Sequence, residues 1–395
     1  ASAPAFGIVF ADDAVVPVLQ VLSLWVIITA VGSVPSAILR REMRFKAIAG
    51  LGAIAALIAQ VVAIAMAFTG FGVWALVAQS IVSPVVVTAL TWWMTRWVPR
   101  FAFSWPDFRK LAGFGSQVLG VEFIAMLRAW GEAAVISRVL GVSAFGYMSI
   151  AQRLVQVVQE LTGSAIVPVT TVAFAKIRES VARLRAAYLK ALKLTYAALS
   201  LPMVFVAVAA PLLVPLLFGG DWDASIIPAQ LLAIAGILAL GAWLDHGLFY
   251  GVGRPGTWLI YALVIDALTL LTTIFVARWG LPAIALGFLC VALVATFARW
   301  FLVARVLATP IRAIAQPFAY LLAVVVVAGA AGWAASVFTS SWPSILSLLV
   351  IGLVVTIAHI AVTALLAKQV VIDVAEIARK LMAGKTLWPM SRGNR

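Results

Sequence analysis

The stretch that decides the fold is residues 14–68, AVVPVLQVLSLWVIITAVGSVPSAILRREMRFKAIAGLGAIAALIAQVVAIAMAF. Two apolar runs, 14–39 and 47–68, flank a short junction that holds Arg40, Arg41, Arg44 and Lys46. The hydrocarbon core of a bilayer is about 30 Å thick, and a helix needs about 20 apolar residues to cross it. Each run is long enough, so the stretch predicts two membrane-spanning helices that turn at a basic junction.

The same alternation continues along the whole chain of 395 residues. Eleven apolar runs have spanning length: 14–39, 47–68, 73–95, 111–135, 143–169, 194–218, 225–250, 257–277, 281–304, 313–338 and 343–366. Backbone groups in lipid must be satisfied within their own segment, and no two-residue alternation indicates a barrel, so each run is predicted as a helix. The sequence therefore predicts an all-α, polytopic integral membrane protein.

Basic residues mark one side of this membrane protein. Most of the 28 Lys and Arg residues lie at every second junction and after residue 366, whereas the other junctions hold only Arg138 and Arg278. Lys and Arg in short loops stay in the cytoplasm, so we expect the rich junctions and the C-terminus to be cytoplasmic. The net charge of +14 then fits a face next to anionic lipid headgroups, and we expect membrane lipids rather than nucleic acid as partners.

Composition and motifs argue against an enzyme. The chain is 65% hydrophobic and 11% charged. A soluble protein of this composition would have too few polar residues to cover its apolar ones. Cys290 is the only cysteine, and His246 and His359 are far apart in sequence, so no metal-ligand cluster is indicated. The chain carries no Walker loop, Gly-x-Ser-x-Gly elbow or His-Glu-x-x-His pair. We therefore expect no enzymatic activity, no metal and no other cofactor.

The first residues resemble the end of a further span. The apolar run Ala1 to Phe10 is followed by Asp12 and Asp13, which suit an outer turn. Three crossings before Asp13 would bring a chain that starts in the cytoplasm to the outer side. With the eleven spans, we expect about fourteen helices in the complete protein.

Two predicted spans carry polar residues on one face. In 143–169, Arg153, Gln156 and Glu160 fall on one side at about 100° per residue, and in 111–135, Arg128 and Glu132 stand four residues apart. Charged groups within a bilayer face a cavity or a partner. These five residues are candidates for a substrate cavity in which arginine attracts a phosphate. The alternative is that Arg128 with Glu132, and Arg153 with Glu160, are internal ion pairs that fix helix packing.

A second set of polar residues lies in the next spans. Asp266 stands near the middle of 257–277, and Asp245 and His246 lie toward the predicted cytoplasmic end of 225–250. Carboxylates and histidine can carry protons, so these three residues are candidates for coupling to an ion gradient. The alternative is a carboxylate hydrogen-bonded between helices.

A weak internal repeat links two parts of the chain. Gly72, Ala75, Thr88 and Trp92 recur 208 positions later as Gly280, Ala283, Thr296 and Trp300. Both segments follow a tight turn and run toward the predicted cytoplasmic side. Transporters are often built from internal repeats with the substrate path between them.

Several local strings together resemble a known family. They are Ile38-Leu-Arg-Arg-Glu-Met-Arg-Phe-Lys46, Glu132-Ala-Ala-Val-Ile-Ser-Arg-Val-Leu-Gly-Val-Ser-Ala-Phe-Gly146, Ser149-Ile-Ala-Gln-Arg-Leu154, Leu217-Phe-Gly-Gly-Asp-Trp222 and Gly251-Val-Gly-Arg-Pro255. Their order and spacing over residues 14–308 resemble the polysaccharide transporter family of lipid-linked oligosaccharide flippases, within the multidrug/oligosaccharidyl-lipid/polysaccharide exporter superfamily. The sequence departs from the family pattern at Glu132, where Asp is common, and at Gly146-Tyr-Met-Ser149, where Gly-Leu-Tyr-Ser is common.

The resemblance implies a function and a domain plan. Family members move an undecaprenyl-pyrophosphate-linked sugar unit across the bacterial cytoplasmic membrane by alternating access between two six-helix lobes, alongside polysaccharide polymerases and glycosyltransferases. The plan that follows is the end of a span at 1–13, part of the first lobe at 14–110, the second lobe at 111–308, an accessory helix pair at 309–366 and a cytoplasmic basic tail at 367–395. The alternatives are an exporter of a drug or a peptidoglycan precursor from the same superfamily, or a polysaccharide polymerase or ligase.

Overall fold

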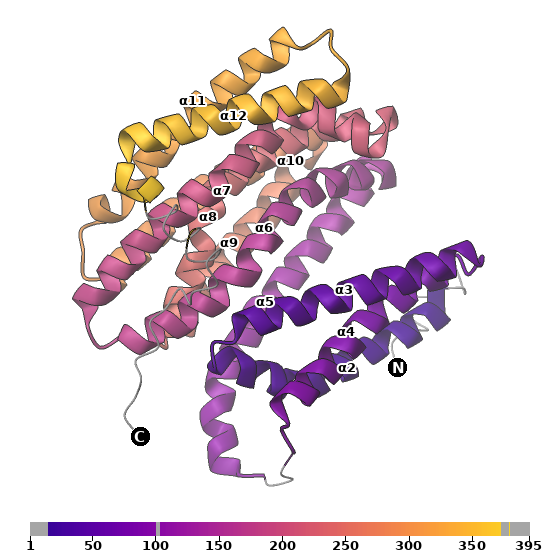
Figure 1. The fold of residues 1–395 in the computed structure, drawn as a ribbon, viewed down its shortest axis with the longest axis vertical. Helices are drawn as coiled ribbons and strands as arrows, with labels where there is room; N and C mark the ends of the chain where they lie inside the picture. Colours follow the sequence, from indigo (N-terminus) through magenta and orange to yellow (C-terminus); the bar gives the residue numbers. More distant parts are fainter. Residues whose placement is uncertain (1–14, 100–102, 373–378, 380–395) are drawn as a thin grey trace. The chain divides into compact units, whose positions relative to one another are not determined.

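The computed structural model describes residues 15–99, 103–372 and 379, and in that part of the chain every regular element is helical (Figure 1). The α-helices are α2 Val15–Arg41, α3 Phe45–Phe68, α4 Val73–Thr95, α5 Trp105–Leu140, α6 Val142–Ile177, α7 Val181–Phe218, α8 Ile226–Gly251, α9 Pro255–Val276, α10 Leu281–Val306, α11 Ile311–Phe338 and α12 Ser344–Leu366. Two 3₁₀ turns, η1 Gly220–Ser225 and η2 Ala277–Trp279, precede α8 and follow α9. The predicted all-α fold is confirmed. The residues expected to end an earlier span lie outside the described residues.

Each predicted span corresponds to one of the helices α2–α12, but three helices are much longer than predicted. Helices α5 and α6 have 36 residues each, and α7 has 38. The helical spacing of Ile177, Val181, Leu184 and Tyr188 in the basic connection 176–193 predicts a helix that lies on the cytoplasmic interface. That prediction is wrong, because α7 begins at Val181 and continues unbroken into the next span. Leu184 and Tyr188, expected on its apolar face, are buried in the core. The hydropathy pattern ends at the basic residues, whereas helical hydrogen bonding continues past them.

Nine helices among the described residues are long and apolar enough to cross a membrane, and α5 and α6 are the two that do not meet this standard. Both are long enough at about 1.5 Å per residue, and they pack lengthwise on α9 and α8, which do meet it. They fall short because they carry the charged and amide side chains that the sequence places inside spans. Polarity is therefore concentrated in two helices.

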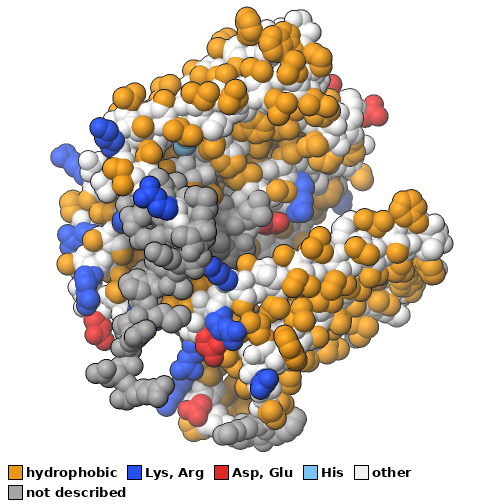
Figure 2. Space-filling model, in the orientation of Figure 1, with side chains coloured by type: hydrophobic (Ala, Val, Ile, Leu, Met, Phe, Trp, Pro, Cys, Tyr) orange, Lys and Arg blue, Asp and Glu red, His pale blue; other side chains and the backbone are white. Residues whose placement is uncertain are grey.

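Large apolar side chains cover much of the outer surface (Figure 2). Examples are Leu57 at 68% exposed, Leu76 at 63%, Leu349 at 67% and Leu353 at 61%. A soluble protein does not expose contiguous apolar faces of this extent, whereas a lipid-facing helix does. The chain is a multi-pass membrane protein.

The chain divides into two compact units, Ala1–Ser104 and Trp105–Arg395. In the first unit, α4 packs against both α2 and α3. Gly32 of α2 faces Thr88 of α4, whose hydroxyl donates to the Ile28 carbonyl oxygen at 3.2 Å. Trp92 Nε1 donates to the Val31 carbonyl oxygen at 3.1 Å. A small residue and two polar side chains thus hold the apolar helices together, as in other membrane bundles.

The second unit is built around α8, which packs on α6, α7 and α10 and contributes the most buried residues (Figure 1). A side chain at Gly247 would collide with Thr170, and one at Gly251 would lie 2.8 Å from the Thr171 carbonyl oxygen, so α6 approaches α8 closely. Figure 2 shows Lys and Arg gathered toward the left end of this unit, the end at which α12 finishes in Figure 1. The six helices α5–α10 equal the number predicted for the second lobe, and their role as a transport lobe stays a prediction.

Helices α11 and α12 form a pair that packs on α7. His359 of α12 is 3% exposed and shares a 2.8 Å hydrogen bond with Ser200 of α7. Tyr320 of α11 donates to Thr363 of α12 at 3.1 Å. A buried polar contact therefore holds the pair to the rest of the second unit, and a part-buried one holds its two helices together.

Candidate functional site

An ionic cluster joins α5 to α9 within the second unit. Arg128 Nη1 lies 2.6 Å from Glu132 Oε1 on the same helix, and Arg128 Nε lies 2.8 Å from Asp266 Oδ1 on α9. The side chains are 30%, 5% and 19% exposed, respectively. The local pair follows from the spacing of four residues, which places both side chains on one helix face. The contact with Asp266 could be identified only from the fold, because α9 is far from α5 along the chain.

Close helix packing brings the members of this cluster together. A Cβ at Gly131 of α5 would lie 2.8 Å from Leu270 of α9, and one at Gly120 would lie 3.0 Å from Leu259. Both glycines therefore let α9 approach α5. The cluster contains one guanidinium and two carboxylates. With all three groups ionised its net charge is −1, and binding one proton or monovalent cation would neutralise it.

The polar face of α6 is exposed. Arg153 Nη1 lies 3.4 Å from Glu160 Oε1, their side chains are 59% and 63% exposed, and Gln156 between them is also exposed. The opposite face is tightly packed, with Ala151 fully buried and Val155 only 6% exposed. The structure thus places the three polar residues together on the side of α6 that the second unit leaves uncovered.

The exposed ion pair on α6 differs from the α5 cluster in strength and availability. A long contact between two mobile, solvated side chains contributes little to stability. Arg153 and Glu160 are therefore available to other groups, whereas Glu132 is held in the protein. The structure shows both internal pairs that the alternative interpretation required, and only the Arg128 pair is built as a packing element.

Asp245 belongs to a different, fully enclosed network. Arg299 Nη1 of α10 lies 2.9 Å from Asp245 Oδ2, and Tyr188 of α7 donates to Oδ1. Arg299 Nη2 donates to the Leu238 carbonyl oxygen at 2.8 Å and to Thr296 Oγ1 at 3.1 Å. Both side chains of the ion pair are 3% exposed. This geometry matches the expected alternative, a carboxylate hydrogen-bonded between helices.

His246 lies apart from its neighbour in sequence. Its ring stacks on Trp258 of α9 with centroids 5.4 Å apart, and it meets the Tyr250 ring edge-on at 4.1 Å. Its Nε2 has no hydrogen-bond partner among the described residues. Adjacent residues on a helix project about 100° apart, so Asp245 and His246 do not pair. The three candidates for ion coupling therefore occupy three separate environments.

Sequence reasoning did not single out Arg299 or Tyr188. Arg299 stands inside an apolar span, and a charge there needs a partner. Asp245 and Asp266 were both available as partners in the sequence, and only the fold decides between them. Tyr188 had been placed on a surface helix, so its buried hydroxyl was not considered.

The fold and the buried ionic groups define a class, polytopic helical membrane proteins with the fold of known transporters. The outward-facing multidrug resistance MATE family transporter of the MOP superfamily aligns with a TM-score of 0.63 and 20% identity, covering 78% of this chain and 74% of that chain. The lipid II flippase MurJ, in an inward closed conformation, aligns with a TM-score of 0.63 and 12% identity, covering 90% of this chain and 75% of that chain.

Sequence comparison gives the family. Residues 1–227 match the family described as polysaccharide biosynthesis protein, and because that is more than half of the chain, the chain belongs to this family. The succinoglycan biosynthesis transport protein ExoT of Rhizobium meliloti (strain 1021) is 30% identical over 224 residues. The match covers 56% of this chain and 44% of ExoT, so the chain spans under half the length of that relative. The predicted family membership is confirmed.

Proposed function

We propose that this chain is the membrane-embedded transport part of a flippase. Its substrate would be a lipid-linked oligosaccharide of the undecaprenyl-pyrophosphate type, moved across the bacterial cytoplasmic membrane for surface polysaccharide biosynthesis by alternating access. Polysaccharide polymerases and glycosyltransferases would act before and after it. Support comes from the family, from the transport function named for ExoT and from the likeness of the fold to a lipid flippase.

The observation that carries the proposal is the exposed polar face of α6. A charged face turned toward hydrocarbon is costly, so Arg153, Gln156 and Glu160 require water, protein or a polar ligand beside them. A flippase needs such a face, because the sugar and pyrophosphate must be sheltered while the lipid tail stays in the bilayer. The guanidinium of Arg153 offers paired N–H donors that match phosphate oxygens. Glu160, at the far end of the same face, suits sugar hydroxyl donors.

The α5–α9 cluster has a second role in this proposal. Arg128 between Glu132 and Asp266 forms a charged cluster that can respond to a proton or a cation, and α5, which carries Arg128 and Glu132, directly precedes α6. Asp266 is the more exposed carboxylate, so it is the one a proton would reach. The enclosed Asp245 and the aromatic-stacked His246 are weaker candidates, because neither of them shares its partners with this cluster.

The test uses a strain that lacks its own copy of the gene and carries the variants. Arg153→Ala should lower surface polysaccharide and raise the unflipped lipid-linked sugar by about 10- to 100-fold, the effect of losing a hydrogen bond to a charged group. Arg153→Lys should retain part of the activity. Arg138→Ala, which removes an exposed charge at the end of α5, is the matched control.

Normal export by a correctly inserted Arg153→Ala protein would contradict the role of Arg153. Export of a drug without any change in lipid-linked sugar would contradict the substrate. Asp266→Asn separates the second role, because it should leave exchange of substrate intact and abolish its dependence on an imposed proton or sodium gradient. Unchanged gradient dependence in that variant would remove the coupling proposal.

A further inference from the structure

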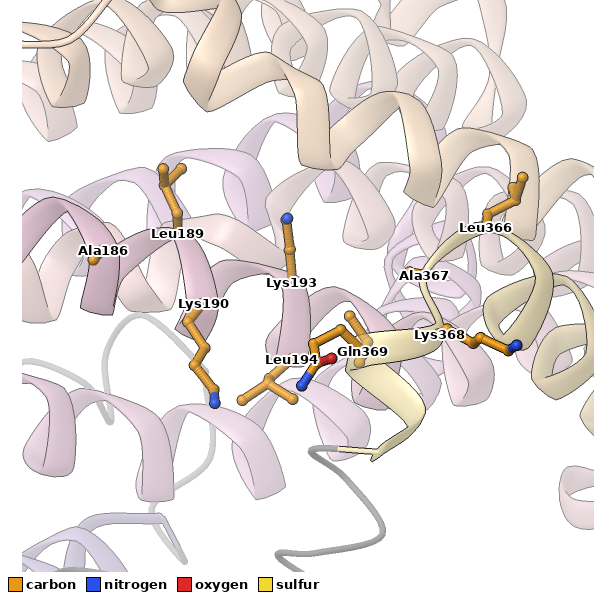
Figure 3. A pocket seen from close by; sticks show the side chains of 10 residues that line it. Ala186, Leu189, Lys190, Lys193, Leu194, Leu366, Ala367, Lys368 and Gln369 are labelled. Carbon is orange, nitrogen blue, oxygen red and sulfur yellow. The ribbon is translucent and has the colours of Figure 1, made fainter.

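A cavity of about 580 Å³ lies within the second unit, between the first turns of α7 and the end of α12 (Figure 3). Its lining comes from five residues between Ala186 and Leu194 on α7 and from Leu366–Val370, where the chain leaves α12. These segments are at the end that the distribution of basic residues predicts to be cytoplasmic. The cavity is separate from the ionic cluster of α5 and α9, and it shares no residue with the polar face of α6.

The lining combines positive charge with apolar surface. Its charged side chains are Lys190, Lys193 and Lys368, and the ten described residues that line it include no Asp or Glu. Its apolar side chains include Leu189, Leu194 and Leu366. A ligand that matches both the charged and the apolar side chains of the lining has an anionic group attached to a hydrocarbon part.

The three lysines are exposed and surround the cavity from both of its segments. In Figure 3, Lys190 and Lys193 extend from opposite sides of α7, and Lys368 extends from the other segment, away from Gln369. Each ammonium sits on a flexible four-carbon stem and acts as a mobile point charge. Together they give the lining a positive charge from both of its segments.

We propose that this cavity binds the phosphate headgroup of an anionic glycerophospholipid, with the start of its acyl chains against the leucines. Basic pockets between spanning helices on the cytoplasmic side are suited to anionic lipid headgroups. A membrane lipid is favoured over a free anion, because soluble phosphate would leave the apolar part of the lining unoccupied. The lipid would tie the end of α12 to α7, and this occupancy does not depend on which substrate the protein transports.

The experiment measures lipid retention by the purified protein. Protein reconstituted in bilayers of phosphatidylcholine with graded phosphatidylglycerol is extracted into mild detergent, and bound lipids are counted by native mass spectrometry. The variant K190Q/K193Q/K368Q should lower the apparent affinity for phosphatidylglycerol roughly tenfold or more. The control R178Q/R183Q/R312Q removes the same charge from exposed residues outside the cavity and should lower the affinity clearly less than the first variant does.

A second variant protects the test against a folding defect. Gln369→Glu keeps all three lysines and adds a carboxylate to the lining, so it should weaken phosphatidylglycerol binding while the protein elutes and unfolds like the wild type. Equal losses in both triple variants would overturn the proposal, and so would equal retention of phosphatidylcholine. Displacement of the lipid by millimolar inorganic phosphate would also overturn it, because it would identify a site for a free anion.

Discussion

Two sets of three helices, α2–α4 and α8–α10, are built alike but bury different groups. In each set the third helix packs on the other two. A threonine on the third helix donates to a backbone carbonyl of the first, from Thr88 to Ile28 at 3.2 Å and from Thr296 to Leu238 at 3.1 Å. The predicted internal repeat therefore has a counterpart in the contacts within each set.

The two sets differ beside that threonine. Arg299 stands three residues after Thr296 on α10, and Asp245 stands seven residues after Leu238 on α8. These two residues form the enclosed ion pair. The corresponding positions of α4 and α2 hold Thr91 and Pro35, both buried. The three-helix arrangement thus forms without an ion pair. In the second set, Asp245 of the pair also accepts a hydrogen bond from Tyr188 of α7, so the added effect of the pair is to attach the set to α7.

The largest effect should come from Arg299→Ala. It leaves Asp245 buried without a counter-charge, and removal of one partner of a buried pair costs about 3–5 kcal/mol. Thr91→Ala at the corresponding position should cost about 1 kcal/mol, because it removes one local hydrogen bond to the Thr88 carbonyl. Unfolding in mixed micelles of increasing SDS fraction measures both variants.

The double variant Arg299→Met with Asp245→Ala tests the role of the ion pair by removing both charges together. An apolar pair should recover much of the stability that Arg299→Ala loses, because no uncompensated charge remains. If Arg299→Ala unfolds like Thr91→Ala, the ion pair has no structural effect and the comparison between the two sets fails.

The sequence predicts the parts of this fold that depend on local pattern. The eleven helices follow from apolar length, and the Arg128–Glu132 pair follows from a spacing of four residues. Partners on different helices do not follow, because Arg128 with Asp266 and Arg299 with Asp245 are fixed by packing alone. The extensions of α5, α6 and α7 were missed because hydropathy reports the membrane thickness and not the end of a helix.

The next effect concerns the first set alone. Gly32 stands four residues after Ile28, and Ala242 stands four residues after Leu238, so the second set already has a methyl group where the first has none. A Cβ at Gly32 would lie 2.5 Å from Thr88 Oγ1 and would break its bond to α2. We expect Gly32→Ala to cost about 1–3 kcal/mol, as overpacking does.

Gly52→Ala on α3 is the matched control for this substitution. No atom lies within 4 Å of a Cβ at that position, so the methyl group should be tolerated. The same SDS titration compares the two variants. Equal stability of Gly32→Ala and Gly52→Ala would mean that the two sets pack at the same distance and that the glycine has no special place in the first.

The smallest effect should come from Thr88, and the comparison with Thr296 isolates the contribution of the ion pair. Thr88→Val removes one hydrogen bond between helices, which in a membrane protein costs about 0.6 kcal/mol. Thr296→Val also removes an acceptor of Arg299 Nη2, and loss of a bond to a charged group costs about 1.5–3 kcal/mol. The near-isosteric substitutions keep the packing, so the difference measures the link between the threonine and the ion pair. In the Arg299→Met, Asp245→Ala background that difference should disappear, and its persistence would show that Thr296 acts independently of the charges.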